Sequence, residues 1–239
     1  MVAPKAAAPL AATTNVRGMF DRIAFRYDAA NRVMSAGVDK LWRRAAMAPL
    51  LKGTGANPCI LDLGAGTLDG SLAIARRAPG ARVASADFAR QMLRVGQQKL
   101  GTQAARIGAH VADGHCLPYA TAAFDGAFSA FCVRNLVHRD VAFAELRRVV
   151  KPGAAVVILE FFRPEKPRWF FDQLYNKYVL PWVGFAITGD KDAYQYLPES
   201  IAAFATRAQL QEELRAAGFA SVSGKELFPG GVASLVVAR

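Results

Sequence analysis

Short apolar runs alternate with amphipathic segments through the middle of this chain. Between residues 59 and 160 the runs predict strands, and the segments between them place apolar residues at helical spacing. The predicted strands are Cys59–Leu63, Arg82–Ala86, Ile107–Ala112, Phe124–Phe131 and Ala154–Glu160. Because these strands are apolar and alternate with helices, they predict a parallel sheet that is covered by helices on both faces.

The two ends of the chain depart from this alternation. Residues 1–16 are rich in Ala, Pro and Thr and predict a disordered tail, whereas residues 17–52 predict helices. Near the other end, Ser221–Leu227 and Val232–Ala238 flank a Pro-Gly-Gly turn and predict an antiparallel hairpin. We therefore predict one Rossmann-like α/β domain over residues 17–239, with a mostly parallel seven-stranded sheet.

The strand-to-helix turn after the first predicted strand is the first candidate site. Gly64 and Gly66 allow a ligand to approach the backbone closely, at the sheet edge where such folds bind nucleotides. Asp69 stands where a dinucleotide motif has its third glycine, and Asp62 precedes the loop. Acids at a helix N-terminus oppose a pyrophosphate and suit a cation. Asp62, Gly64, Gly66 and Thr67 therefore favour S-adenosylmethionine (SAM), which carries a sulfonium, over NAD.

Three further candidates follow the next strands. Asp87 ends the second strand and is placed to accept the ribose hydroxyls, although it could simply cap the next helix. Asp113 and Gly114 are placed to hold the adenine ring, and a plain turn is the alternative. Arg134 and Asn135 follow the fourth strand, where Arg134 could stabilise an oxyanion on the methyl acceptor or form a surface ion pair.

Charge and composition restrict the partners. The net charge is +11, and eight basic residues against three acidic ones lie between Arg17 and Lys52. This indicates an anionic partner such as lipid or a phosphate-bearing ligand, or a basic surface with no specific partner. The chain has no Lys/Arg run of the nucleic-acid type, so no nucleic acid is expected. Three cysteines and three histidines without motif spacing predict no metal site and a cytoplasmic location.

Aromatic residues concentrate late in the chain. Eleven Phe, Trp and Tyr residues lie within residues 161–196, part of a segment of residues 161–205 that separates the fifth strand from the C-terminal unit. We expect this segment to form a wall over the crevice, suited to a flat aromatic or isoprenoid substrate. A helical subdomain with an apolar core is the alternative.

With these motifs in place, the chain from Met19 onward resembles the ubiquinone/menaquinone biosynthesis C-methyltransferases, the UbiE/MenG family. Its members are class I SAM-dependent methyltransferases, to which the C-terminal hairpin also points. The resemblance rests on motifs spread over the whole chain: Met19–Ala24 with Tyr27, Asp28 and Asn31; Asp39 with Trp42–Arg44; Arg148–Gly153; Leu159–Phe161; Tyr194–Ile201; Ala217–Phe219; and Gly230–Ala233.

The resemblance implies SAM-dependent methylation of a ring carbon of a polyprenylated quinol. Thr67, Asp87 and Asp113-Gly114 then contact SAM, with Ala130 at a position where the family has Ser. The N-terminal helices form a lid, and the basic N-terminal face docks on anionic lipid at the inner face of the membrane. For the acceptor, we expect Arg134 to hold the oxyanion and Asn135 and Tyr27 to orient it. The sequence leaves open whether the protein forms a homodimer or joins a quinone-synthesis complex.

The chain departs from the family pattern at five positions: Leu68, Ala130, Cys132, Phe162 and Val236. We expect Leu68 to affect cofactor affinity and the others to lie near the substrate. Another aromatic or polyketide acceptor, or a non-catalytic SAM-binding scaffold, therefore remains an alternative, as does an NAD-dependent enzyme.

Overall fold

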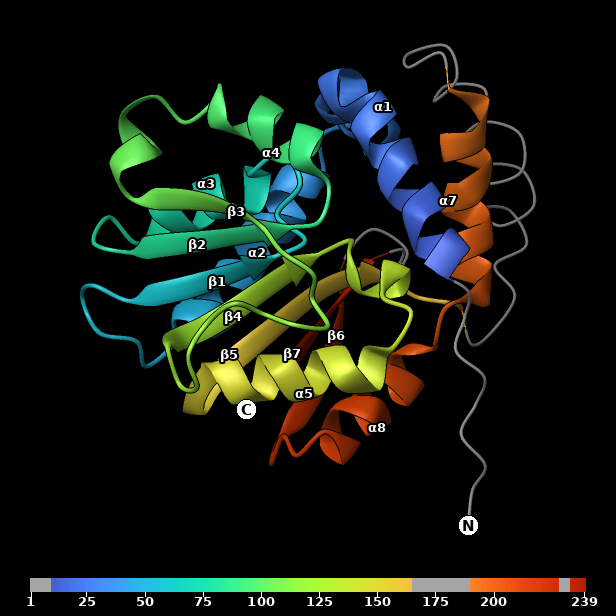
Figure 1. The fold of residues 1–239 in the computed structure, drawn as a ribbon. Coiled ribbons are helices and arrows are strands. Elements are labelled where there is room, and N and C mark those ends of the chain that lie inside the picture. The colour runs from blue at the N-terminus through green and yellow to red at the C-terminus, as the bar shows by residue number, and fades with distance from the viewer. Residues whose placement is uncertain (1–9, 165–189, 228–232) are drawn as a thin grey trace.

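The computed structural model describes residues 10–164, 190–227 and 233–239. A seven-stranded sheet with the order β3-β2-β1-β4-β5-β7-β6 forms its centre (Figure 1). The first five strands in this order are parallel, and β7 is antiparallel to both β5 and β6. The strands are β1 (Cys59–Leu63), β2 (Arg82–Asp87), β3 (Ile107–Val111), β4 (Phe124–Ala130), β5 (Val150–Phe161), β6 (Val222–Leu227) and β7 (Ala233–Ala238). This is the predicted mostly parallel sheet. The order of the strands reverses between β1 and β4, which are parallel neighbours.

Helices cover both faces of the sheet, and each face has its own core. The core under α2, α3 and α4 includes Leu50, Ile74 and Phe128. The core under α5 and α8 includes Phe143 and Leu210. These helices are α2 (Asp39–Leu51), α3 (Asp69–Arg77), α4 (Arg90–Gln97), α5 (Arg139–Val149) and α8 (Arg207–Ala216). Short 3₁₀ turns, η1 (Gly101–Ala105) and η2 (Val133–Asn135), precede β3 and follow β4.

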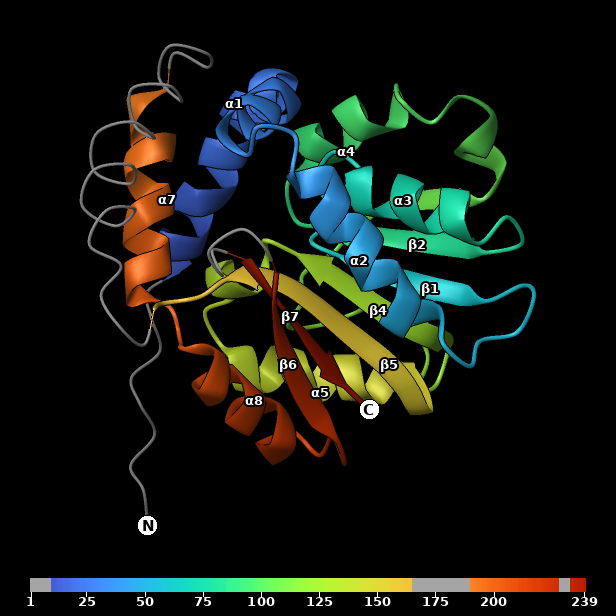
Figure 2. The same cartoon turned by 180° about the vertical axis from the view of Figure 1, so that it is seen from behind.

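Two more helices lie side by side at the edge where β1, β2 and β4 end (Figures 1 and 2). They are α1 (Leu10–Met34) and α7 (Lys191–Ala203). Met19 and Ile23 of α1 pack with Tyr196 and Leu197 of α7. Ala24 packs against α4, so the N-terminal helix closes over the edge of the sheet as the lid prediction required.

Most predicted elements match the observed ones, with two differences. Helix α1 begins at Leu10, so the predicted disordered tail of residues 1–16 is too long; alanines beside Leu10 favour a helix. Strand β5 begins at Val150 rather than Ala154, because Val150 pairs with Phe124. The pairing register shifts just after Phe124, and such an irregularity tolerates the Pro-Gly pair inside the strand.

Two predicted features lie outside the described residues. They are most of the aromatic segment (165–189) and the Pro-Gly-Gly turn between β6 and β7. Among the residues that the structure describes, no helix is both long enough and apolar enough to cross a membrane.

Candidate active site

The loop after β1 turns sharply beneath β2. Gly64 and Gly66 have φ of +70° and +52°, which L side chains rarely adopt. The Gly64 N–H donates to the Ala86 carbonyl at 2.8 Å. A Cβ at Gly64 would overlap the Cys132 side chain. Cys132, one of the departures from the family pattern, therefore packs directly on the glycine loop.

Leu68 has a structural role that the sequence did not show. Its φ is +66°, in the region that favours glycine, and it precedes the first residue of α3. Its side chain is fully buried in the core rather than turned to the crevice. Space for it comes from Gly96 of α4, where a Cβ would lie 2.5 Å from Leu68 Cγ. The Leu68 side chain thus couples the loop to α4 and does not reach a ligand at the sheet edge.

Asp62 faces inward, below the loop. Its Oδ2 accepts a hydrogen bond from Ser71 Oγ at 2.6 Å, and Ser71 Oγ lies 2.6 Å from Ser85 Oγ. Burial raises the pKa of Asp62 to about 6, although the Ser71 bond opposes this. The carboxylate thus anchors the start of α3 from below, and its effect on a cationic ligand is electrostatic.

Asp87 ends β2 and holds the same loop from the other side. Its two carboxylate oxygens accept hydrogen bonds from the Gly66 N–H and the Ala89 N–H, both at 2.8 Å. Asp87 lies at the sheet edge and just before the N-terminus of α4. Its position is therefore compatible both with accepting ribose hydroxyls and with capping the helix. Burial raises the pKa of Asp87 to about 6, and nearby Asp21 adds to the rise. Each oxygen still has a lone pair available to a hydroxyl donor.

Asp113 and Gly114 lie after β3, at the outer part of this edge. Asp113 Oδ1 accepts from the His115 backbone N–H at 2.9 Å and lies 2.5 Å from His115 Nδ1. Although burial acts against it, the bonds to His115 hold the pKa of Asp113 below its usual range. Gly114 is buried against Leu63 and Leu136. The pair therefore forms a capped turn, with an exposed carboxylate.

A chain of charged groups ties the lid to the glycine loop, and we call it the lid clasp. Thr67 Oγ1 donates to Asp28 Oδ1 of α1 at 2.5 Å, and Lys99 Nζ bridges Asp28 and Asp69. Arg32 of α1 then joins Asp69 to Asp39. The clasp comprises Asp28, Arg32, Asp39, Arg43, Thr67, Asp69 and Lys99. Asp69 thus neutralises protein cations, so its predicted interaction with a cationic ligand has a strong competitor.

Arg134 forms a buried ion pair with Glu160. Its Nη1 donates to Glu160 Oε1 at 2.6 Å and to the Phe131 carbonyl at 2.9 Å. The Arg134 side chain is 6% exposed and that of Glu160 is 0% exposed. The alternative of a surface ion pair for Arg134 is therefore wrong. Glu160 also accepts from the backbone N–H groups of Phe161 and Arg134, so it fixes both η2 and the guanidinium.

Asn135 and Tyr27 lie around this ion pair. Asn135 Oδ1 accepts from the Tyr196 hydroxyl of α7 at 2.8 Å. Tyr27 of α1 lies within the electrostatic reach of Arg134, and burial raises the pKa of both tyrosines. Arg134 and Asn135 therefore lie together in η2, with Asn135 bonded to α7, and the assignment of Tyr27 to the same site stays a prediction.

The remaining departures from the family pattern have different environments. Val236 is fully buried in β7 opposite Ile158, so its expected place near the substrate is wrong. Its neighbours belong to the core under α5 and α8. Phe162 lies against Phe204 with ring centroids 5.6 Å apart. Ala130 is partly buried at the end of β4, beside the loop that carries Cys132.

Sequence reasoning assigned no site role to three residues that complete this region. Glu160 carried a signal, because it is a charged residue at the end of an otherwise apolar strand. Tyr196 belongs to the family motif Tyr194–Ile201, although its partner Asn135 was not predicted, and Lys99 carried no signal, since only the folding of α1 brings Asp28 to it.

The comparisons with known proteins agree with this geometry. Residues 10–238 match the model of the ubiE/COQ5 methyltransferase family. A demethylmenaquinone methyltransferase of Thermus thermophilus is 42% identical over 92% of this chain and 98% of its own. A ubiquinone/menaquinone biosynthesis C-methyltransferase of Syntrophotalea carbinolica is 40% identical over 92% of each chain.

Solved structures support the fold at low identity. The (4+2)-cyclase SpnF is similar with a TM-score of 0.68, 18% identity and coverage of 95% of this chain and 96% of that one. A Haemonchus contortus phosphoethanolamine N-methyltransferase in complex with SAM has a TM-score of 0.61 and 15% identity over 82% of this chain and 51% of that one.

Fold and site together define a class I SAM-dependent methyltransferase. The strand order puts the glycine loop at the switch point between β1 and β4, where folds of this kind bind nucleotide-like ligands, and this fits SAM. The chain belongs to the ubiE/COQ5 methyltransferase family. SAM is its cofactor, and the assignment of Gly64, Gly66, Thr67 and Asp87 to its binding site stays a prediction.

Proposed function

We propose that this protein methylates a ring carbon of a polyprenylated quinol in quinone biosynthesis, using SAM. The observation that carries the proposal is the buried Arg134, which Glu160 fixes in η2, two residues after the Cys132 that packs against Gly64. The names of the relatives, which include demethylmenaquinone methyltransferase, support the same substrate class.

Arg134 would act on the phenolic oxygen of the quinol. Loss of the phenolic proton makes the ortho ring carbon nucleophilic, and a fixed cation lowers the free energy of the resulting oxyanion. Arg134 stays protonated at neutral pH, so it stabilises charge and does not act as a base. Burial raises the pKa of Tyr27 and of Tyr196, which makes both poor bases as well. Water or ionisation of the quinol itself would then release the proton.

SAM would supply a methyl group on a sulfonium; in-line displacement would move it from sulfur to the ring carbon and leave the neutral thioether, and the ring carbon would then lose its proton to water to restore the aromatic ring. The chain contributes mainly position: Asp87 and the glycine loop fix one reactant, and Arg134 and Asn135 fix the other. The lid clasp holds α1 over both, which excludes water from the reacting atoms.

The test is incubation with methyl-labelled SAM and reduced demethylmenaquinol or a demethylated benzoquinol, followed by mass spectrometry. We expect a product that is heavier by one labelled methyl on a ring carbon. Arg134→Ala should reduce turnover while SAM affinity stays within about twofold. SAM binding without any quinol product would contradict the substrate assignment.

A different aromatic or polyketide acceptor is a second candidate. It is favoured by Cys132, one of the departures from the family pattern, because this side chain fills the space against Gly64. The same incubation with a panel of hydroxylated aromatic acceptors separates the two candidates. Methylation of another acceptor at a higher kcat/KM than any quinol would favour this second function.

A quinol with an isoprenoid tail resides in a bilayer, so we also propose peripheral association at the cytoplasmic face of the membrane. The basic N-terminal helices are the expected contact.

A further inference from the structure

We propose that the groove between α2 and α3 binds the phosphate headgroups of acidic phospholipids. This inference rests on the proposed membrane association and identifies its surface and its ligand. The groove has a volume of about 590 Å³, within the rough range of 300–1,000 Å³ for small-ligand sites. Gly64, Gly66, Asp87 and Arg134 are not among the residues that line it.

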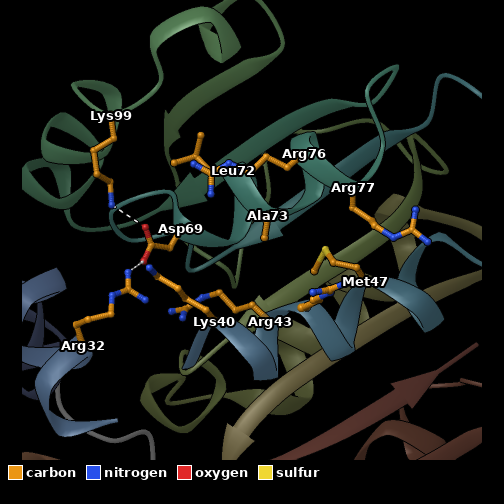
Figure 3. Close-up of a pocket in the computed structure, with 11 residues that line it drawn as sticks. Arg32, Lys40, Arg43, Met47, Asp69, Leu72, Ala73, Arg76, Arg77 and Lys99 are labelled. Carbon is orange, nitrogen blue, oxygen red and sulfur yellow. Dashed lines mark hydrogen bonds and ion pairs between the residues drawn. The ribbon is translucent and has the colours of Figure 1, made fainter. Parts of the chain in front are cut away.

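Nearly all of the charged residues that line the groove are cationic. Seven of the eleven lining residues are Lys or Arg, and Asp69 is the one acid. They are Arg32, Lys40, Arg43, Arg44, Met47, Asp69, Leu72, Ala73, Arg76, Arg77 and Lys99. Figure 3 shows Lys40, Arg43 and Met47 of α2 beside Asp69 and Ala73 of α3. Such a concentration of one sign of charge favours an anionic ligand.

The acid in the groove is already neutralised by the protein. Asp69 pairs with Lys99 at 2.8 Å and with Arg32 at 3.2 Å. By contrast, Lys40, Arg44, Arg76 and Arg77 make no side-chain hydrogen bond or ion pair within the described part of the chain. Four cations on two walls are therefore available to an external anion.

Arg43 adds a second, independent observation. Its side chain is 11% exposed and its Nη1 pairs with Asp39 at 2.6 Å. Its Nε is buried and has no hydrogen-bond partner among the described residues. A buried donor without a partner is costly, and an anion in the groove is a group that could satisfy it.

Apolar side chains flank the cations, which favours a bilayer over a soluble phosphate. Leu41 is 62% exposed and lies three residues from Arg44, on the same side of α2. Val33 is 58% exposed and follows Arg32 in α1; Phe25, 74% exposed, lies eight residues earlier on a similar face. Exposed apolar groups beside cations are typical of helices that lie in the headgroup region of a membrane.

The test is co-sedimentation with vesicles of phosphatidylcholine alone or with phosphatidylglycerol added, at low and at physiological salt. We expect binding only to the acidic vesicles, weakened by salt. The double variant Lys40→Gln/Arg44→Gln should bind at least tenfold more weakly, since each surface cation contributes roughly a fivefold change in affinity. Arg76→Gln/Arg77→Gln should show a similar loss from the opposite wall.

The matched control is Arg82→Gln/Lys225→Gln, which removes the same charge from exposed positions outside the groove. Equal loss in this control would show that only net charge matters and would overturn the proposal. Binding of inorganic pyrophosphate by the wild type, lost in the groove variants without any vesicle binding, would instead assign the groove to a soluble phosphate.

The groove variants should keep wild-type turnover with a short-tailed quinol in detergent, because none of the four residues belongs to the clasp or the site. Failure of vesicle binding with turnover intact would overturn this inference alone. Absence of turnover in the wild type would instead count against the proposed function.

Discussion

Arg134 and Glu160 are joined at 2.6 Å in a pair that solvent barely reaches, although they come from a turn after β4 and the end of β5. Glu160 accepts two further hydrogen bonds, from the backbone N–H groups of Arg134 and Phe161, so the carboxylate has no freedom to leave. A buried pair of this kind is weak evidence for stability, because desolvation offsets much of the attraction. Its consequence is a guanidinium with a fixed position at the sheet edge.

Glu160→Gln tests this positioning role. The amide still accepts a hydrogen bond but leaves the buried guanidinium without its counterion, so we expect kcat to fall at least tenfold. SAM affinity should change by less than about twofold, because Glu160 makes no contact with the glycine loop or Asp87. Stability should drop by about 1–3 kcal/mol, below the full penalty for an unpaired buried charge.

Steady-state kinetics and calorimetric SAM titration check this split, and thermal unfolding shows whether the variant is folded. An unchanged kcat in a folded variant would mean that Arg134 needs no fixed partner. Glu160→Asp, which keeps the charge, should restore part of the lost kcat.

SAM affinity should depend on pH through Asp87. Burial raises the pKa of this carboxyl to about 6, and the protonated form loses acceptor capacity for ribose hydroxyls. The dissociation constant should therefore be flat above pH 7 and rise toward about tenfold per unit below pH 6. Calorimetry between pH 5 and 8 measures this, with Asp87→Asn as the control that should bind weakly and lose most of the pH dependence.

Asp62 should make the fold less stable as pH rises. Its pKa is raised by burial to about 6 in the folded state, against about 3.9 when unfolded, so the folded state holds the proton more tightly. The favourable contribution is complete below pH 4 and is lost as pH rises through 6, at most roughly 3 kcal/mol. Urea unfolding at pH 5 and 7.5 should show Asp62→Asn, which cannot ionise, losing less stability than the wild type over this interval.

Leu68 and Gly96 should behave as a coupled pair. Leu68→Ala empties a fully buried position and should cost about 3–5 kcal/mol. Gly96→Ala should cost about 1–3 kcal/mol, because its Cβ would lie 2.5 Å from Leu68 Cγ and 2.7 Å from the Thr67 carbonyl carbon. The double variant removes one of these clashes, so its loss should be smaller than the sum by at least about 0.5 kcal/mol. Chemical denaturation checks this, and strict additivity would contradict the packing described.

The local sequence carried much of this fold because the determinants are short-range. The apolar run Cys59–Leu63 and the glycines after it predicted β1 and its turn, and the alternating elements predicted a mostly parallel sheet. The local sequence did not predict that β5 begins at Val150. This start depends on the pairing of Val150 with Phe124, which extends β5 back to the end of α5.

The sequence by itself determined the sheet, the glycine loop and the acids at the strand ends, because each of these features depends on a few consecutive residues. Only the tertiary structure decided how the charges pair. Asp69 meets Lys99 and Arg32, Arg134 meets Glu160, and Leu68 turns into the core rather than toward the ligand. These partners are 26 to 37 residues apart, so they meet through helix packing and strand order, which no local pattern encodes.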